Sequence, residues 1–375
     1  MVSSETALLQ WYIAKNKYMS RKKKLRFMLL LDQVERPSIP AVTFDFASYT
    51  DANSELEFRF DVAGVYELRS LLRISDTVVT AHGDTCSGDT ALCVMLARLA
   101  FPTRYYDMMK TVERGTAWLC RVLLHMIDYV HDTFADKLFM AESIVSARME
   151  EYCKAVEAKG APTEGVFGFP DGTKVAVCRP SPRRHGERGE NLQKHLYSGH
   201  KRIHCLNYQA VTAPDGLYTF EGKFLYGDPA YGARKYIVSG YKGNSVSADE
   251  SDVNSEMSRL RESVEWNFKC MKTLWSYVDY NKQQKVRLSP VGKFVKAAML
   301  LTNCHNCYYG GNQISQYFDL PPPSLQDYLG YCARSSTTFN TQDTIAHSNP
   351  CIFAHVTDLS NNSIERRSTT RLEQS

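Results

Sequence analysis

The sequence lacks features that would assign it to several large classes of protein. It has no run of about 18 apolar residues, so no transmembrane helix is expected. No apolar secretion signal stands near its beginning, and its 11 cysteines are odd in number and scattered. We therefore expect reduced thiols inside a cell rather than a secreted disulfide framework.

Several familiar catalytic patterns are missing as well. There is no glycine-rich phosphate loop and no Ser–His–Asp arrangement. Cys304 and Cys307 form a single CxxC pair without a second pair at zinc spacing, which favours packed thiols over a metal site. The formal net charge of +4 is only mildly basic and excludes little by itself.

The composition is that of an ordinary soluble globular protein, with 43% hydrophobic and 23% charged residues in 375 positions. We expect a weakly ordered leader over 1–55, a helical domain over 56–160, a domain with strands over 161–334, and a disordered tail over 335–375. The basic run Arg21–Arg26 suits a nuclear address, a phosphate-contacting arm or a solvated positive face.

The helical domain contains clear start and stop signals. Asp61 is expected to cap one helix, and Ser87 and Gly88 to begin a strongly apolar one that Pro102 ends. A short helix over 105–112, a glycine-containing break and a long helix over 116–134 follow. This order is the outline of a helix-turn-helix, although any small helical bundle contains the same outline. Together with the motifs that follow in the sequence, it predicts DNA contact here.

From residue 166 the apolar period becomes that of strands. Residues 166–177 are interpreted as a hairpin that holds Asp171 at its turn. Strands are expected over 203–211, 217–220 and 224–227, the last ending at Asp228. A helix from about 254 to 275 carries Glu265, and another over 291–304 closes the domain.

Three carboxylates on three separate elements suggest a divalent-metal site that acts on phosphate, because Mg²⁺ prefers carboxylate oxygens. Simpler interpretations exist: Asp-Gly after a strand is often only a turn, and Glu265 is four residues from Lys269, a spacing that suits an ion pair. Residues 171–245 contain twelve Lys or Arg against six Asp or Glu, which suits a polyanionic substrate.

Taken together, these motifs resemble the DDE transposases of the PIF/Harbinger superfamily, also described as DDE superfamily endonucleases. The resemblance runs from about Phe58 to Leu329. Gly168–Thr173 is similar to the family motif Gly-Phe-(Ile/Val)-Asp-Gly-Thr, and Leu225–Tyr231 to Gly-Asp-x-Ala-Tyr. Arg259–Lys272 is similar to its last catalytic helix. The resemblance implies that Asp171, Asp228 and Glu265 are the catalytic, metal-binding acids.

The family implies an α/β fold with an RNase H-like mixed sheet and flanking helices. It also implies Mg²⁺ or Mn²⁺, DNA cleavage and strand transfer by a two-metal mechanism, and a nuclear location. A separate Myb/SANT-like partner would assist DNA binding, and a homo-oligomer is a possible assembly. The residues expected to hold the DNA backbone are basic: Lys201, Arg202, Arg259, Arg261 and Lys269.

Two departures from the family pattern stand out. Pro170 replaces an aliphatic residue, and proline is ill suited to a central strand. Only residues 221–223 join the expected strand over 217–220 to the strand that ends at Asp228. Two parallel strands need a crossover connection of about a dozen residues. We therefore expect that the crossover is deleted and that the sheet cannot close in the usual way. A decayed or domesticated copy that binds without cutting, or a faulty gene model, would explain the short link. Glu262 is an alternative to Glu265 as the third acid.

Overall fold

The structure, a computed structural model, describes residues 4–31, 38–39, 41, 43–139, 142–181, 192–219, 224–227, 237–241 and 246–330. The chain divides into two compact units, 1–42 and 43–375. In the first unit α1 (Ser4–Lys15) and α2 (Arg21–Leu31) form a helical hairpin, and Lys24 Nζ donates to the Ala14 carbonyl at 2.8 Å. None of the helices in the described ranges has the length and apolarity that a membrane span needs.

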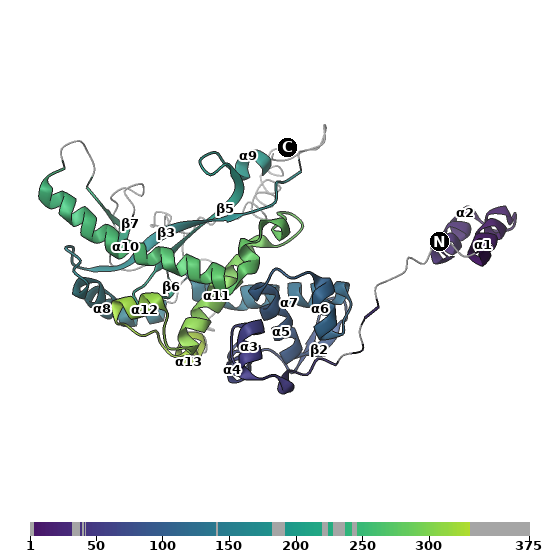
Figure 1. Cartoon of the computed structure of the whole chain (residues 1–375), viewed down its shortest axis with the longest axis horizontal. Coiled ribbons are helices and arrows are strands. Elements are labelled where there is room, and N and C mark those ends of the chain that lie inside the picture. Colours follow the sequence, from purple (N-terminus) through teal and green to yellow (C-terminus); the bar gives the residue numbers. More distant parts are fainter. Residues whose placement is uncertain are drawn as a thin grey trace, which may run out of the picture. The chain divides into compact units, whose positions relative to one another are not determined.

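Helices form the first part of the second unit (Figure 1). They are α3 (Asp51–Phe58), α4 (Val62–Leu71), α5 (Gly88–Ala100), α6 (Tyr105–Val112) and α7 (Thr116–Phe139), with the one-turn helix η1 (Phe46–Ser48) and the ribbon of β1 (Thr77–Val79) and β2 (Thr85–Ser87) beside them. The predicted helix starts are confirmed: Asp61 caps α4 by accepting from the Gly64 amide at 2.6 Å, and Ser87 caps α5 by accepting from the Thr90 amide.

The expected order of short helix, break and long helix is present in α6 and α7, but α7 is a core helix. Leu119 and Val122 on α7 are fully buried. Its exposed side carries Asp128 and Asp132, which accept hydrogen bonds from Lys293 of α11 (Val291–Tyr308). This part of α7 therefore offers acids rather than cations to solvent, and DNA contact by the helix pair stays a prediction.

A mixed sheet follows, so the protein is of the α/β class. Its strands are β3 (Val166–Ala176), β4 (Tyr197–Ser198), β5 (Ile203–Thr212), β6 (Tyr218–Thr219), β7 (Phe224–Gly227) and β8 (Ile237–Ser239). The order is β4–β5–β3–β7–β8, with β6 also paired to β5. β5 is antiparallel to β3, whereas β7 is parallel to β3 and β8 is parallel to β7.

The expected hairpin with Asp171 at its turn is wrong. β3 is one continuous strand whose residues 169–176 pair in unbroken register with β5, and Asp171 lies opposite Ala210. Gly172 is not among the glycines with positive φ, so the local Asp-Gly signal makes no turn here. The physical reason is that β5 is long enough to pair with eight successive residues of β3, which outweighs a local turn preference.

Pro170 lies within β3, a central strand of the sheet, despite the poor fit of proline to such a position. It is tolerated because the ladder between β3 and β7 pairs Val166 with Phe224 and Gly168 with Leu225 and then stops. Beyond Gly168 the side of β3 that faces β7 has no ladder partner among the described residues, so a residue that cannot donate a backbone hydrogen bond loses little there.

β6 and β7 lie on opposite sides of β3, separated by β5 and β3 themselves. Residues 220–223, which join them, fall outside the described residues, so the predicted deletion of the crossover remains a statement about the sequence. The expectation that the sheet would not close is wrong, because β7 does pair with β3.

Helices cover both faces of this sheet. α10 (Ala248–Leu274) crosses β3 and β7 on one face (Figure 1), and α8 (Glu142–Ala158) packs Tyr152 and Cys153 against Phe167, Val211 and Leu225 on the other. The remaining helices are α9 (Leu192–Leu196), η3 (Ser276–Asp279), η4 (Asn281–Gln283), α12 (Gln313–Phe318) and α13 (Leu325–Gly330). One hydrophobic core contains residues of α5, α7, α11, β3 and β5, so the helical part and the sheet share it.

The turn between β5 and β6 is buried and held by several helices. Asp215 is fully buried, and its carboxylate accepts hydrogen bonds from Arg148 Nη1 at 2.8 Å and Tyr152 OH at 2.7 Å, both on α8. Burial raises the pKa of Asp215, and the Arg148 charge and the Tyr152 hydroxyl offset part of that rise. Asn306 Nδ2 on α11 donates to the Asp215 carbonyl at 2.9 Å. Asp215 is therefore a structural ion-pair partner inside a buried turn.

Replacing Asp215 by Ala should lower the free energy of unfolding by about 3–5 kcal/mol, because the largely buried Arg148 would lose its counter-ion. Chemical denaturation of the full chain measures this loss. Asp319→Asn is the matched control, since Asp319 pairs with Lys159 at the surface and should cost about 1 kcal/mol or less. Equal losses in the two variants would contradict the structural role of Asp215.

Candidate active site on the face covered by α10

Asp171 lies on the sheet face that α10 covers. Directly opposed residues of neighbouring strands project their side chains to the same face. Ala210, opposite Asp171, belongs to the hydrophobic cluster that contains Phe268 and Met271 of α10. Asp171 itself is half-buried and makes at least one further interaction. Its side chain therefore projects to the sheet face that is covered by α10, the helix that carries Glu265.

Asn267 fixes how α10 lies on the sheet. This residue is fully buried, and its Nδ2 donates to Thr212 Oγ1 at 3.2 Å and to the Gly216 carbonyl at 3.3 Å. Thr212 is the last residue of β5 and lies opposite Phe169 of β3, two residues before Asp171. The hydrogen bonds therefore hold one flank of α10 against β5 and the β5–β6 turn, close to the level of Asp171.

Glu265 lies on the other flank of α10. Two residues correspond to about 200° around a helix, so Glu265 points away from the side that Asn267 holds. Lys272, seven residues after Glu265, shares its flank, and Lys272 Nζ donates to the Lys174 carbonyl of β3 at 3.4 Å. The flank that carries Glu265 therefore reaches β3 at Lys174, three residues after Asp171. Glu265 is exposed, and no ion pair joins it to Lys269 in the described part of the chain.

Glu262 occupies a different position. It is two residues after the fully buried Leu260, which packs in a cluster with Phe169 of β3. Glu262 is exposed and points to the side of α10 opposite Leu260, away from the sheet. Of the two glutamates, Glu265 is therefore the one whose flank of the helix reaches the strand that bears Asp171.

Asp228, the second expected acid, lies outside the described residues. β7 ends at Gly227, and Asp228 is the next residue in the sequence. Within the described ranges, no group of three or more His, Cys, Asp or Glu side chains is close enough to hold a metal ion. The two acids that are described, Asp171 and Glu265, offer only carboxylate oxygens, which are ligands that suit Mg²⁺ or Mn²⁺.

The basic residues expected to bind DNA are spread over two regions. Lys201 and Arg202 are exposed at the tip of the β4–β5 hairpin, just before Ile203. Ile203 begins β5 and is seven residues, about 23 Å at 3.3 Å per residue, from Ala210 at the level of Asp171. On α10, Lys269 is exposed, Arg261 is half-buried, and Arg259 donates to Glu256 and to the Lys159 carbonyl. Only Lys201, Arg202 and Lys269 are thus exposed without an acidic partner among the described residues.

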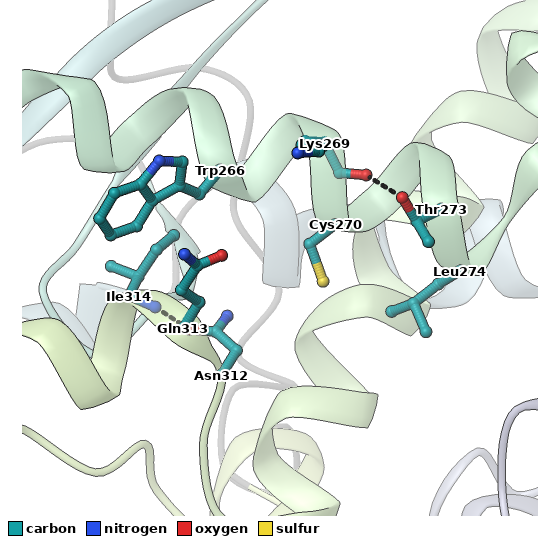
Figure 2. A pocket seen from close by; sticks show the side chains of 8 residues that line it. All are labelled: Trp266, Lys269, Cys270, Thr273, Leu274, Asn312, Gln313 and Ile314. Atoms are coloured by element: carbon teal, nitrogen blue, oxygen red, sulfur yellow. Dashed lines mark hydrogen bonds between the residues drawn. The ribbon is translucent and has the colours of Figure 1, made fainter.

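A pocket of about 250 Å³ lies between α10 and the start of α12 (Figure 2). Trp266, Cys270 and Leu274 line it from α10, and Asn312, Gln313 and Ile314 from the start of α12. Thr273 Oγ1 donates to the Lys269 carbonyl at 2.9 Å along its upper edge. Neither Asp171 nor Glu265 lines the pocket, so it is separate from the candidate site.

The cysteine pair of α11 is packed in the core, as predicted. Cys304 is fully buried and Cys307 nearly so, and burial raises the pKa of both thiols well above the ordinary value. Both are free thiols and belong to no metal-binding group among the described residues.

Asn267 is the residue of this region that the sequence patterns did not single out. Asn267 is seven residues after Leu260, so its amide lies on the apolar stripe of α10. A polar residue in a buried apolar stripe usually has hydrogen-bond partners, and this feature of the sequence could have identified Asn267. The contacts that Lys272 and Asp215 make with distant parts of the chain were likewise not apparent from the sequence.

The protein has an α/β fold in which helices cover both faces of a mixed sheet. Acidic residues lie on a strand of the sheet and on the long helix α10. Residues 217–303 match the family model described as DDE superfamily endonuclease, a segment that runs from β6 into α11 and contains Asp228 and Glu265. This match covers less than a quarter of the chain, and it supports a transposase-derived nuclease domain of the DDE superfamily, whose members generally use divalent metals. No curated protein and no solved structure matches the chain.

Asn267→Ala should destabilise the protein by about 1–3 kcal/mol, because Thr212 and the buried Gly216 carbonyl each lose a donor. Asn254→Ala is the matched control on the same helix: its bonds to the backbone of Tyr241 are exposed and should be worth about 1 kcal/mol or less. Urea unfolding midpoints compare the two. A control that costs as much as Asn267→Ala would argue against the anchoring role.

Proposed function

We propose that the protein is a metal-dependent DNA endonuclease of transposase descent, with Asp171, Asp228 and Glu265 as its catalytic acids. The observation that supports this most strongly is the position of Asp171 on the sheet face covered by α10, with Glu265 on the flank of α10 that reaches β3. The family match contains the second and third acids and supports the same reaction class.

The sheet supports an RNase H-like fold as the finer assignment. Three strands, β3, β5 and β6, alternate in direction, and β7 and β8 run parallel to β3 on its other side. The register that pairs Gly168 with Leu225, continued without a shift, would bring the residue after Gly227 level with Asp171. In this proposal Asp228 therefore joins Asp171 from the neighbouring strand.

The three acids would hold two Mg²⁺ or Mn²⁺ ions, which when bound supply Lewis-acid stabilisation of the phosphate oxygens. The chain's own contribution is rigid placement. The β3–β5 ladder fixes Asp171, and Asn267 and Lys272 fix the rotation of the helix that bears Glu265. Lys201, Arg202 and Lys269 would bind phosphates of the DNA on either side of the cleaved bond, together with Arg261 and with Arg259, which donates to the Lys159 carbonyl after α8.

Some features of the proposal rest on motif resemblance alone. They are the PIF/Harbinger subtype, a nuclear location, a Myb/SANT-like partner protein and a possible homo-oligomer. The short link over 220–223 favours a second candidate function, a domesticated copy that binds DNA or a protein without cutting, because a strained connection would disturb the position of the Asp228 strand.

Purified full-length protein should nick supercoiled plasmid with Mn²⁺ or Mg²⁺ and not with EDTA. Asp171→Ala and Glu265→Gln should each lower the nicking rate about a hundredfold or more, since each removes a metal-binding carboxylate worth several kcal/mol in the transition state. Glu262→Gln is the matched control on the same helix and should stay within about twofold of the parent.

Each result of this experiment decides between the alternatives. Loss of nicking in Glu262→Gln with retention in Glu265→Gln would overturn the assignment of the third acid. A folded parent protein that binds DNA but never nicks it, with either metal, would replace the nuclease by the binding-only function.

A further inference from the structure

The α1–α2 hairpin exposes large apolar side chains to an unusual degree. Among the described side chains from Leu8 to Met28, only one hydrophobic side chain, that of Ile13, is buried. Trp11, Tyr12 and Tyr18 are 62%, 63% and 100% exposed, and Phe27 is 46% exposed. A pair of helices this small cannot bury enough apolar surface to be stable alone, and exposed patches of this kind mark interaction sites.

The same hairpin carries a strong positive charge. Residues 4–31 contain seven Lys or Arg and a single acid, Glu5. Four of the cations, Arg21–Lys24, are consecutive, and because each residue turns a helix by about 100° they surround the first turn of α2. No side of that turn is apolar. A lipid surface or an amphipathic partner helix requires one continuous apolar stripe, and the cations of this turn interrupt such a stripe between the exposed Leu8 and Leu9 of α1 and Leu25 of α2.

Aromatic rings and cations interleaved at a surface match one kind of ligand well. An unpaired nucleic-acid strand presents base faces that stack on aromatic rings, together with phosphates that bind cations. A duplex offers the phosphates but keeps its base faces stacked inside. Trp11, Tyr12 and Tyr18 would provide the stacking surface, and the ring of cations on α2 would neutralise the backbone.

We propose that the α1–α2 hairpin is a binding site for an unpaired nucleic-acid strand. It lies outside residues 217–303 and contains none of the proposed catalytic acids, so its binding needs no divalent metal. Lys24 has a structural role that differs from that of the other cations, because its Nζ donates to the Ala14 carbonyl and so joins the two helices.

Fluorescence anisotropy of labelled oligo(dT), oligo(U) and a duplex, measured with the full chain in EDTA, tests the proposal. One variant carries Trp11→Leu, Tyr12→Leu and Tyr18→Leu, which keeps apolar bulk and helix propensity but removes the rings. A second carries Arg21→Gln, Lys22→Gln, Lys23→Gln and Arg26→Gln. The matched control neutralises four exposed cations of the second unit: Arg104, Lys154, Lys282 and Lys285.

The parent should bind the single strands more tightly than the duplex. The leucine variant should bind them roughly tenfold or more weakly, because each stacked base contributes about fivefold or more. In the glutamine variant, log affinity should depend less steeply on log salt concentration. The magnitude of the slope should fall by up to about 3, since each phosphate that the protein no longer neutralises accounts for about 0.7. The control should retain the single-strand preference, and the two single strands together show whether DNA or RNA is favoured.

Two results would overturn the proposal. One is full single-strand affinity in the leucine variant with an unchanged thermal unfolding curve. The other is binding of the parent to vesicles containing phosphatidylserine with no affinity for either single strand. Because EDTA is present throughout, the binding result does not depend on whether the protein is a nuclease. Likewise, an absence of single-strand binding would not argue against metal-dependent nicking.

Discussion

The arrangement of the candidate site depends on the hydrogen bonds that Asn267 makes to the end of β5 and to the following turn. A helix lying on a sheet can rotate about its axis or slide along it without losing much apolar contact, because hydrophobic packing is largely non-directional. A buried amide that must find its acceptors removes both freedoms. The acceptors are themselves fixed, since Arg148 and Tyr152 hold the carboxylate of Asp215 in the same turn.

Once α10 is held in this way, its two flanks serve different purposes. The flank of Asn267 and Leu274 meets the β5–β6 turn and α12 and is structural. The flank of Glu265 and Lys272 is directed to β3, the strand in which Asp171 is half-buried. A carboxylate on a strand and another on a helix with a fixed rotation form the kind of rigid support that metal ligation requires.

Local signals in the sequence predicted much of this fold. The caps at Asp61 and Ser87, strands β5 and β7, and the helix that carries Glu265 follow from side-chain chemistry within a few residues. The continuous strand through Asp171 does not, because pairing with distant β5 outweighs the Asp-Gly turn preference. The role of Asn267 depends on Gly216, 51 residues away in sequence, and no local pattern encodes that contact.

The central claim is that Asp171 and Glu265 share one metal-binding site. A crystal of the full chain grown with Mn²⁺, examined by its anomalous scattering, tests it most directly. The account predicts an anomalous peak within about 2.0–2.3 Å of carboxylate oxygens from both Asp171 and Glu265. A peak bound by Glu262 instead, or no peak near Asp171 in a well-ordered crystal at millimolar Mn²⁺, would contradict it.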